Sequence, residues 1–349
     1  MANLGYIQVT RRCNQLCRFC SNPPTGVETT FEVACQHVDD LVQRGYDGVI
    51  LTGGEPTIVP WLASLIRYAR DKKLHVRIIT NGQLLGEGSL LEELLAAGLS
   101  HVHVSLYSYR PEVQDMLARH PGSHANIMRT LERLGELKGV TADINCVINH
   151  YNASELDANV KFVLERFPFI HHFVWNNLDP RMNRVAENPD TIPRLWEFEL
   201  SLYRAMQLVS KSGRTFRVER VPLCYMVEFA ECSTETRKIV KEEERIVHFL
   251  DQKGCVRQVS RGFVHAKAEV CRVCTLDPIC AGLDGLGEYF DGSELYPVFV
   301  DPEPIIRRIR GEEGEAPAAP KRSERATGAR RKPAVTQGVS TRTRGRRRT

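Results

Sequence analysis

Apolar and polar residues alternate in two periods along the first half of the chain. From residue 6 to about residue 176, short β-branched runs are separated by stretches in which apolar residues recur every three or four positions. Each link between consecutive short runs is long enough for a crossover helix, so the pattern predicts βα units around a parallel sheet. The predicted strands are 6–10, 48–52, 76–80, 101–105, 143–147 and 172–175. The predicted helices are 31–44, 61–72, 90–97, 124–138 and 154–167.

The second half follows a different pattern. Prolines at 189 and 193 interrupt the βα alternation, and the sequence then predicts a helix at 194–212, a strand at 215–218 and a charge-rich helix at 234–253. Beyond residue 310 the chain is rich in Glu, Ala and Pro and then in Arg, Thr and Gly. Such a segment cannot bury enough apolar surface to offset the entropy of ordering, so we expect disorder over 312–349.

The C-terminal tail is basic, whereas the rest of the chain is slightly acidic. The length of 349 residues predicts two domains or one large α/β domain with an appendage, and a hydrophobic content of 42% is enough for a sizeable core. The net charge is +4, but residues 321–349 carry eleven Lys or Arg and one acid, which leaves the rest near −6. Such a tail could contact RNA or another polyanion by neutralising phosphates. No aromatic residue interleaves it for base stacking, and a merely solubilising tail is the simpler interpretation.

The sequence predicts a cytoplasmic protein with no membrane partner. No run of about 18 apolar residues occurs, and the first residues lack the basic-then-apolar pattern of a signal peptide. Thiols stay reduced in the cytosol, so eleven cysteines indicate metal ligation more than disulfides.

Three cysteines follow the first predicted strand. Cys13, Cys17 and Cys20 have the spacing C-x3-C-x2-C, with Phe19 just before the third thiol. Clustered thiolates suit an iron–sulfur cluster or zinc. A structural zinc site is closed by four protein ligands, whereas a reactive centre keeps a position open. The lack of a fourth local ligand therefore favours a reactive centre over a zinc knuckle.

The next strands end in polar or glycine-rich segments. The second ends in Gly53-Gly54-Glu55-Pro56, where glycine allows close backbone approach to a ligand and the proline restricts the exit of the chain. The third ends at Asn81 and the fourth at Ser105.

Together these segments resemble the radical S-adenosylmethionine (SAM) superfamily. The resemblance implies a partial (β/α)6 TIM-like barrel with ligands at the carboxyl ends of its strands. It also implies a 4Fe–4S cluster whose open iron binds SAM, with electrons from a flavodoxin- or ferredoxin-type donor. One electron would cleave SAM to a 5′-deoxyadenosyl radical, which abstracts hydrogen from a substrate. In that family the cluster ligands correspond to Cys13, Cys17 and Cys20. The SAM contacts correspond to Phe19, Gly53, Gly54, Glu55, Asn81 and Ser105.

A second cysteine set lies in the C-terminal half. Cys271, Cys274 and Cys280 have the spacing C-x2-C-x5-C, which resembles part of the SPASM and twitch extensions of radical SAM enzymes. The resemblance implies an auxiliary 4Fe–4S cluster, with Cys224 as the preferred fourth ligand and Cys232 or Cys255 as alternatives. A full SPASM pattern needs further cysteines after Cys280, so one auxiliary cluster is expected. Thiolate spacing alone does not separate this cluster from zinc.

These interpretations predict three parts: a radical SAM core at 1–190, an extension with the auxiliary site at 191–310, and a basic tail at 311–349. The expected function is oxidative modification of a peptide or protein. A small metabolite or sugar is the alternative substrate, and RNA is a third. The chain begins almost on the first strand, so no N-terminal peptide-recognition domain is expected. A non-enzymatic iron–sulfur electron carrier would need neither the Gly53–Pro56 segment nor Asn81. No catalytic side chain is assigned.

Overall fold

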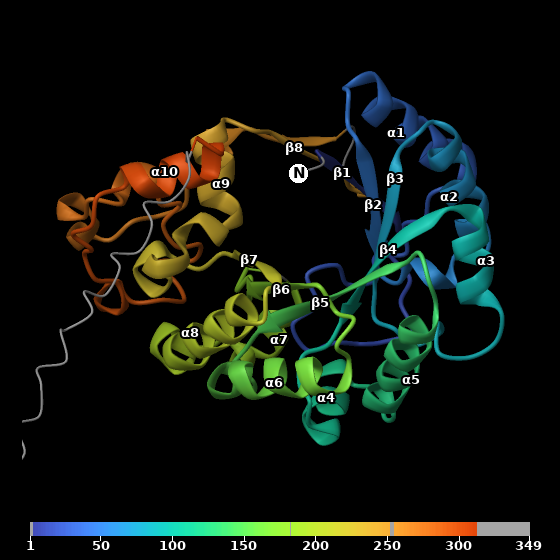
Figure 1. Cartoon of the computed structure of the whole chain (residues 1–349), viewed down its shortest axis with the longest axis horizontal. Coiled ribbons are helices and arrows are strands. Elements are labelled where there is room, and N and C mark those ends of the chain that lie inside the picture. Colours follow the sequence, from blue (N-terminus) through green and yellow to red (C-terminus); the bar gives the residue numbers. More distant parts are fainter. Residues whose placement is uncertain (1–2, 182, 252–254, 313–349) are drawn as a thin grey trace, which may run out of the picture. The chain divides into compact units, whose positions relative to one another are not determined.

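The computed structural model describes residues 3–181, 183–251 and 255–312, and residues 1–312 cluster into one compact unit. Nine strands in this unit form one sheet in the order β7-β6-β5-β4-β3-β2-β1-β8-β9 (Figure 1). Strands β1 to β8 pair in parallel, and only β9 is antiparallel, to β8. The strands are β1 Leu4–Thr10, β2 Gly48–Gly53, β3 His75–Thr80, β4 Leu99–Ser105, β5 Thr141–Ile148, β6 His172–Asn177, β7 Thr215–Glu219, β8 Arg245–His248 and β9 Val256–Gln258.

Helices connect the parallel strands, which makes the fold the α/β partial barrel that the sequence predicts. All six strands and all five helices expected before residue 177 are present within a few residues of their predicted bounds, and α4 is an addition. The helices are α1 Phe31–Gln43, α2 Leu62–Asp71, α3 Leu90–Ala97, α4 Pro111–Ala118, α5 Ser123–Glu136, α6 Leu156–Arg166, α7 Asn183–Glu187, α8 Leu195–Lys211, α9 Thr234–Lys241 and α10 Glu303–Arg310.

Local residue chemistry explains where these helices begin and end. Thr30 caps α1, because its hydroxyl accepts a hydrogen bond from the Val33 N–H at 3.4 Å. Helix α3 ends at Ala97 and is followed by Gly98, which has a φ of +117°. Glycine adopts such a positive φ at little cost, because it has no Cβ. Gly98 directly precedes β4 and so turns the chain back into the sheet.

The two faces of the sheet differ in polarity. Alternate strand residues such as Leu51, Ile78, Val104 and Trp175 are fully buried and belong to the main apolar core with the helices. The intervening positions carry polar side chains on several strands, among them Arg77 on β3, His103 on β4 and Asp143 on β5. Because successive side chains of a strand point to opposite faces, the polar set lies on the face away from the helices.

The predicted helix at 234–253 is wrong beyond residue 241. Helix α9 ends at Glu242, which adopts a left-handed φ of 54°, and residues 245–248 form β8. Two β-branched residues, Ile246 and Val247, favour extended backbone there, and β8 gains hydrogen bonds from the edge of β1. The long-range pairing thus outweighs a local pattern of charges.

The extension and the core share this one sheet. Strand β7 pairs with β6, and β8 pairs with β1, although both lie after the predicted domain boundary at residue 190. The predicted tail from residue 313 onward lies outside the described residues. Among the described helices, none combines the length and apolar character required to cross a bilayer.

The core makes a direct stability prediction. Trp175 is 1% exposed and packs against Phe173 and Phe216, whereas Trp196 is 64% exposed. We expect Trp175→Ala to lower the free energy of unfolding by about 3–5 kcal/mol, because it leaves a cavity in the core. Denaturant titration of both variants checks this, with Trp196→Ala expected to stay within about 0.5 kcal/mol of the parent. Equal losses in the two variants would contradict the proposed packing.

Candidate active site

The three N-terminal cysteines lie on a loop that several elements hold in place. The loop follows β1, and the backbone N–H groups of Leu16 and Arg18 donate to the carbonyls of Ala118 and Leu117 at 3.2 and 2.9 Å. The Gln15 amide donates to the Ser123 hydroxyl at 2.9 Å. Helices α4 and α5 therefore fix the loop from one side.

Arg18 ties the same loop to the segment after β6. Its guanidinium forms an ion pair with Asp190 at 2.7 Å and donates to the Asn188 amide oxygen at 3.2 Å. It also lies over the Tyr151 ring, 5.3 Å from the centroid. These contacts cross more than 130 positions of sequence and give the loop a defined conformation.

The sulfur atoms of Cys13, Cys17 and Cys20 lie close enough to interact electrostatically. Burial raises the pKa of the Cys13 thiol to about 11 and that of Cys17 to about 12, and it raises that of Cys20 as well. Without a metal the three thiols are therefore protonated at neutral pH, and metal binding must release protons.

Gly53 and Gly54 bring the end of β2 against the cysteine loop. A Cβ on Gly53 would lie 2.2 Å from the Thr10 carbonyl oxygen, and one on Gly54 would lie 2.0 Å from the Arg12 carbonyl oxygen. The Gly54 and Glu55 N–H groups donate to these two oxygens at 2.7 and 2.9 Å. The close approach that glycine permits here is thus to the chain's own backbone.

Glu55 is 1% exposed and is held by four hydrogen bonds. Its Oε1 accepts from the Thr57 N–H, the Thr57 hydroxyl and the Thr80 hydroxyl at 3.0, 2.6 and 2.7 Å. Its Oε2 accepts from the Asn81 N–H at 2.7 Å. Burial raises the pKa of the carboxyl, and the four donors oppose that shift. Glu55 therefore joins the ends of β2 and β3, a role that the sequence did not reveal.

Asn81 connects β3 to the cysteine loop. Its amide nitrogen donates to the Asn14 side-chain oxygen at 2.7 Å and lies 3.7 Å from the Cys13 sulfur. The structure thus brings together two of the predicted site regions, the cysteine loop and the end of β3.

Phe19 and Ser105 both lie next to Tyr107. Phe19 is 6% exposed and packs edge-on against the Tyr107 ring at 4.8 Å, within a small apolar cluster. The Tyr107 side chain lies near those of Ser105 and Cys17, and burial raises the pKa of its hydroxyl. Sequence reasoning missed Tyr107, although its place two residues after Ser105 at a strand end was a usable signal. The contact of Phe19 with adenine stays a prediction.

A second polar layer lies deeper on the same face. The His103 Nδ1 lies 3.1 Å from an oxygen of Asp143, one strand away. Each is two residues deeper than the pair Ser105 and Asn145, or ~7 Å. Burial raises the pKa of Asp143 to about 7 and lowers that of His103 to about 3. The sequence signal was a polar residue at every second position of strands otherwise rich in β-branched residues.

The C-terminal cysteines also come together. Cys224, Cys271 and Cys280 lie near enough to influence one another electrostatically, and burial raises the pKa of Cys224 to about 12. Backbone N–H groups point at two sulfurs of the set: Gly282 to Cys280 at 3.4 Å and Val298 to Cys274 at 3.3 Å.

The two alternative ligands have other neighbours. Cys232 lies among Glu231, Arg217 and Arg237, and Cys255 lies beside Arg44 at 3.8 Å. Among the described residues, the structure therefore supports Cys224 as the fourth member of the C-terminal set.

Comparisons with known proteins agree with this geometry. Residues 7–163 match the family model described as "Radical SAM superfamily". A PqqA peptide cyclase from Xanthomonas axonopodis pv. citri is 30% identical over 163 residues, covering 46% of this chain and 43% of that protein. An AdoMet-dependent heme synthase from Methanosarcina barkeri is 26% identical over 308 residues, covering 85% of this chain and 84% of that protein. The chain thus spans less than half the length of the peptide cyclases that it matches.

Among solved structures, Streptococcus suis SuiB bound to the precursor peptide SuiA has a TM-score of 0.60 and 16% identity. The match covers 81% of this chain and 72% of that one. At this identity the likeness establishes the fold alone. It covers a larger share of the chain than residues 7–163, which the family model matches.

The contact between β2 and the cysteine loop gives a testable prediction. We expect Gly54→Ala to separate the two segments, because its Cβ cannot coexist with the Arg12 carbonyl oxygen at 2.0 Å. SAM affinity should fall at least about tenfold, a cost of about 1.4 kcal/mol, and bound iron should fall by the share that the N-terminal cysteine loop holds. Gly262→Ala is the control, since its nearest neighbour is 3.8 Å away. Iron analysis and equilibrium dialysis with SAM measure both, and a Gly54→Ala protein with parental values would refute the contact's role.

Proposed function

Because residues 7–163 form a radical SAM domain, we propose that this chain is a radical SAM enzyme that oxidatively modifies a peptide or protein. The observation that carries the proposal is the junction of Asn81 with the cysteine loop, which brings three thiols and the ends of β2 and β3 together. A superfamily member holds a 4Fe–4S cluster and SAM, and this pair supplies the radical that abstracts hydrogen. We assign Cys13, Cys17 and Cys20 as the cluster ligands.

The chain's own residues would orient SAM at the strand ends. Ser105 and the Gly53–Glu55 segment present polar groups there, and Glu55 Oε2 offers an acceptor to an ammonium group. Asn81 would orient the loop more than the ligand, because its amide is already bonded to Asn14. Phe19 and Tyr107 would exclude water beside the thiols.

The deeper polar layer would meet the substrate. Among the described contacts, the Nε2 atom of His103 and the Oδ1 atom of Asp143 are buried without a hydrogen-bond partner, so a polar substrate group could satisfy them. A pKa of about 7 lets Asp143 take or release a proton at neutral pH. We propose Asp143 as the group that removes a proton from the substrate radical, whose remaining electron the auxiliary cluster proposed below would accept.

The second cysteine set supports an auxiliary 4Fe–4S cluster held by Cys224, Cys271, Cys274 and Cys280. Four tetrahedral Zn–S bonds of 2.3 Å would place sulfurs roughly 3.8 Å apart. Among the described residues, no three of these sulfurs lie within 4.8 Å of one another. The wider spacing and the N–H groups aimed at Cys274 and Cys280 favour a cluster over zinc.

The similarity to PqqA peptide cyclases, up to 30% identity over about half of this chain, favours a peptide as the substrate. A tetrapyrrole is the second candidate, because the heme synthase relative matches along 85% of this chain. Arg77 suits the carboxylates of either class, since its guanidinium lies on the polar face and its buried Nε has no hydrogen-bond partner among the residues that the structure describes.

SAM cleavage tests the proposal. We expect reduced, anaerobically reconstituted protein to form 5′-deoxyadenosine from SAM, and a deuterated substrate to transfer deuterium into it. Candidate peptides and Fe-coproporphyrin III should be compared side by side. Asp143→Asn should keep SAM cleavage but lower product formation by 10²–10⁴-fold. Absence of 5′-deoxyadenosine under all these conditions would refute the enzyme function.

Iron counting tests the two clusters. We expect about eight irons per chain for two 4Fe–4S clusters. The count should fall by half in the triple variant Cys13→Ala, Cys17→Ala, Cys20→Ala and by half in Cys224→Ala, Cys274→Ala. Cys146→Ala is the control, because Cys146 is buried in the apolar core. Four irons in the parent protein would exclude the auxiliary cluster.

A further inference from the structure

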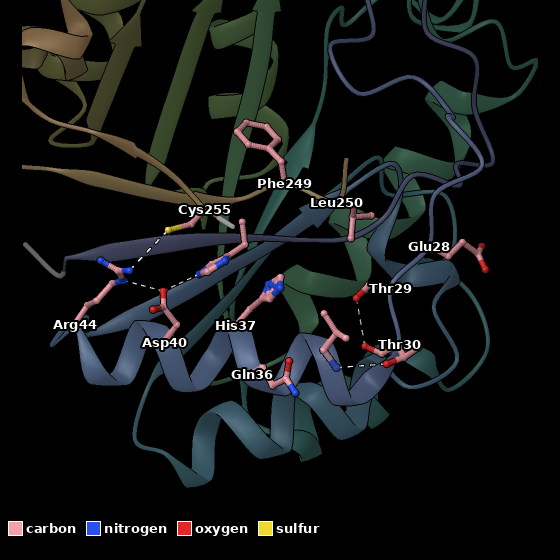
Figure 2. A pocket seen from close by; sticks show the side chains of 12 residues that line it. Glu28, Thr29, Thr30, Gln36, His37, Asp40, Arg44, Phe249, Leu250 and Cys255 are labelled. Carbon is pink, nitrogen blue, oxygen red and sulfur yellow. Dashed lines mark hydrogen bonds and ion pairs between the residues drawn. The ribbon is translucent and has the colours of Figure 1, made fainter. Parts of the chain in front are cut away.

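A cavity of about 530 Å³ lies between α1 and the β8–β9 hairpin, outside the site described above. Figure 2 shows the α1 side chains of His37, Asp40 and Arg44 on one side and Cys255 on the other. No part of the proposed radical chemistry uses these groups.

The cavity holds nitrogen, oxygen and sulfur donors at close range. Ligand atoms of Asp40, His248 and Cys255 all lie within 4.8 Å of one another, and the Nε2 of His248 lies 3.1 Å from the Oδ2 of Asp40. A tetrahedral zinc ion with bonds of 2.0–2.3 Å needs donors roughly 3.3–3.8 Å apart. The three donors therefore need to move by about 1 Å at most.

His37 supplies a fourth donor. Its ring centroid lies 4.2 Å from that of His248, and its Nδ1 is buried without a hydrogen-bond partner among the described residues. An unpaired buried nitrogen costs free energy, and coordination to a metal would recover it. His37 and Asp40 lie three positions apart on α1, so both project from one face of the helix.

We propose that His37, Asp40, His248 and Cys255 bind one zinc ion. The mixed N, O and S donor set suits this borderline-soft metal. In the described part of the chain, Asp40, His248 and Cys255 are the one group of three or more such donors compact enough for a single ion, in contrast to the two cysteine sets, and His37 lies next to this group.

Arg44 contacts two of the proposed ligands. Its Nε donates to the Oδ2 of Asp40 at 2.8 Å and its Nη2 lies 3.8 Å from the Cys255 sulfur, so the guanidinium would turn away from the sulfur when the ion binds and keep its bond to the carboxylate. Hydrogen bonds to a ligating carboxylate of this kind orient it and are a usual feature of metal sites.

The ion would join the C-terminal half to the start of the barrel. Cys255 precedes β9, and the same hairpin loop holds Asp251, which pairs with Arg11 at 2.8 Å just before the cysteine loop. Zinc would thus secure the β8 edge of the sheet and the anchor of Arg11. This inference does not depend on the proposed enzymatic function.

Zinc and cobalt binding by the full-length, cluster-reconstituted protein test the site. We expect one zinc per chain to survive gel filtration, and Co²⁺ to give a thiolate charge-transfer band in the difference spectrum against the cobalt-free protein. Cys255→Ala and His248→Ala should abolish both signals while the iron content stays parental. Cys35→Ala is the matched control, since Cys35 lies half-buried on α1 outside the donor set.

Three results would overturn the proposal. The first is a parent protein without zinc at micromolar free Zn²⁺, and the second is zinc that persists in Cys255→Ala. The third is zinc that is lost only in Cys274→Ala, which would place the ion in the C-terminal cysteine set. Loss of iron together with zinc in His248→Ala alone would indicate misfolding, and Cys255→Ala then decides.

Discussion

The close backbone contact between the ends of β1 and β2 is the constraint on which the site depends. Gly53 and Gly54 lie against the carbonyl groups of Thr10 and Arg12 at distances that admit no Cβ. This contact aligns Glu55 with the end of β3, where four hydrogen bonds hold its buried carboxylate. Since the cysteine loop starts at the same two carbonyls, the position of the thiols is set by the sheet itself.

The two faces of the sheet have different roles: the apolar face stabilises the fold, and the polar face is available for chemistry. Apolar side chains pack against the helices and supply the burial that offsets the entropy of ordering. The opposite face carries His103, Asp143 and Arg77, whose desolvation costs free energy unless a partner compensates it. The helices that pack on the apolar face hold the strands in place. The polar groups of the opposite face therefore remain available to a ligand.

Strong periodic signals made most of the fold predictable. Six strands and five helices follow from apolar spacing, and Cys13, Cys17, Cys20 and Asn81 follow from motifs at strand ends. Strand β8 was missed because its two β-branched residues, Ile246 and Val247, lie among charged residues, and only the pairing with β1 shows that they form a strand. The hydrogen-bond partners of Glu55 and the meeting of Asp40 with His248, 208 positions apart, depend on tertiary packing that no local pattern carries.

The central claim is that the cysteine loop holds a 4Fe–4S cluster with one iron open to SAM. Electron paramagnetic resonance of the reduced protein tests it most directly, with SAM that carries a nitrogen-15 label in its amino group. We expect SAM to change the signal of one cluster, the label to couple to it, and this signal to vanish when Cys13, Cys17 and Cys20 are replaced by Ala. A reduced-cluster signal that SAM leaves unchanged, with no coupling to the label, would show that no iron of the cluster is open to SAM.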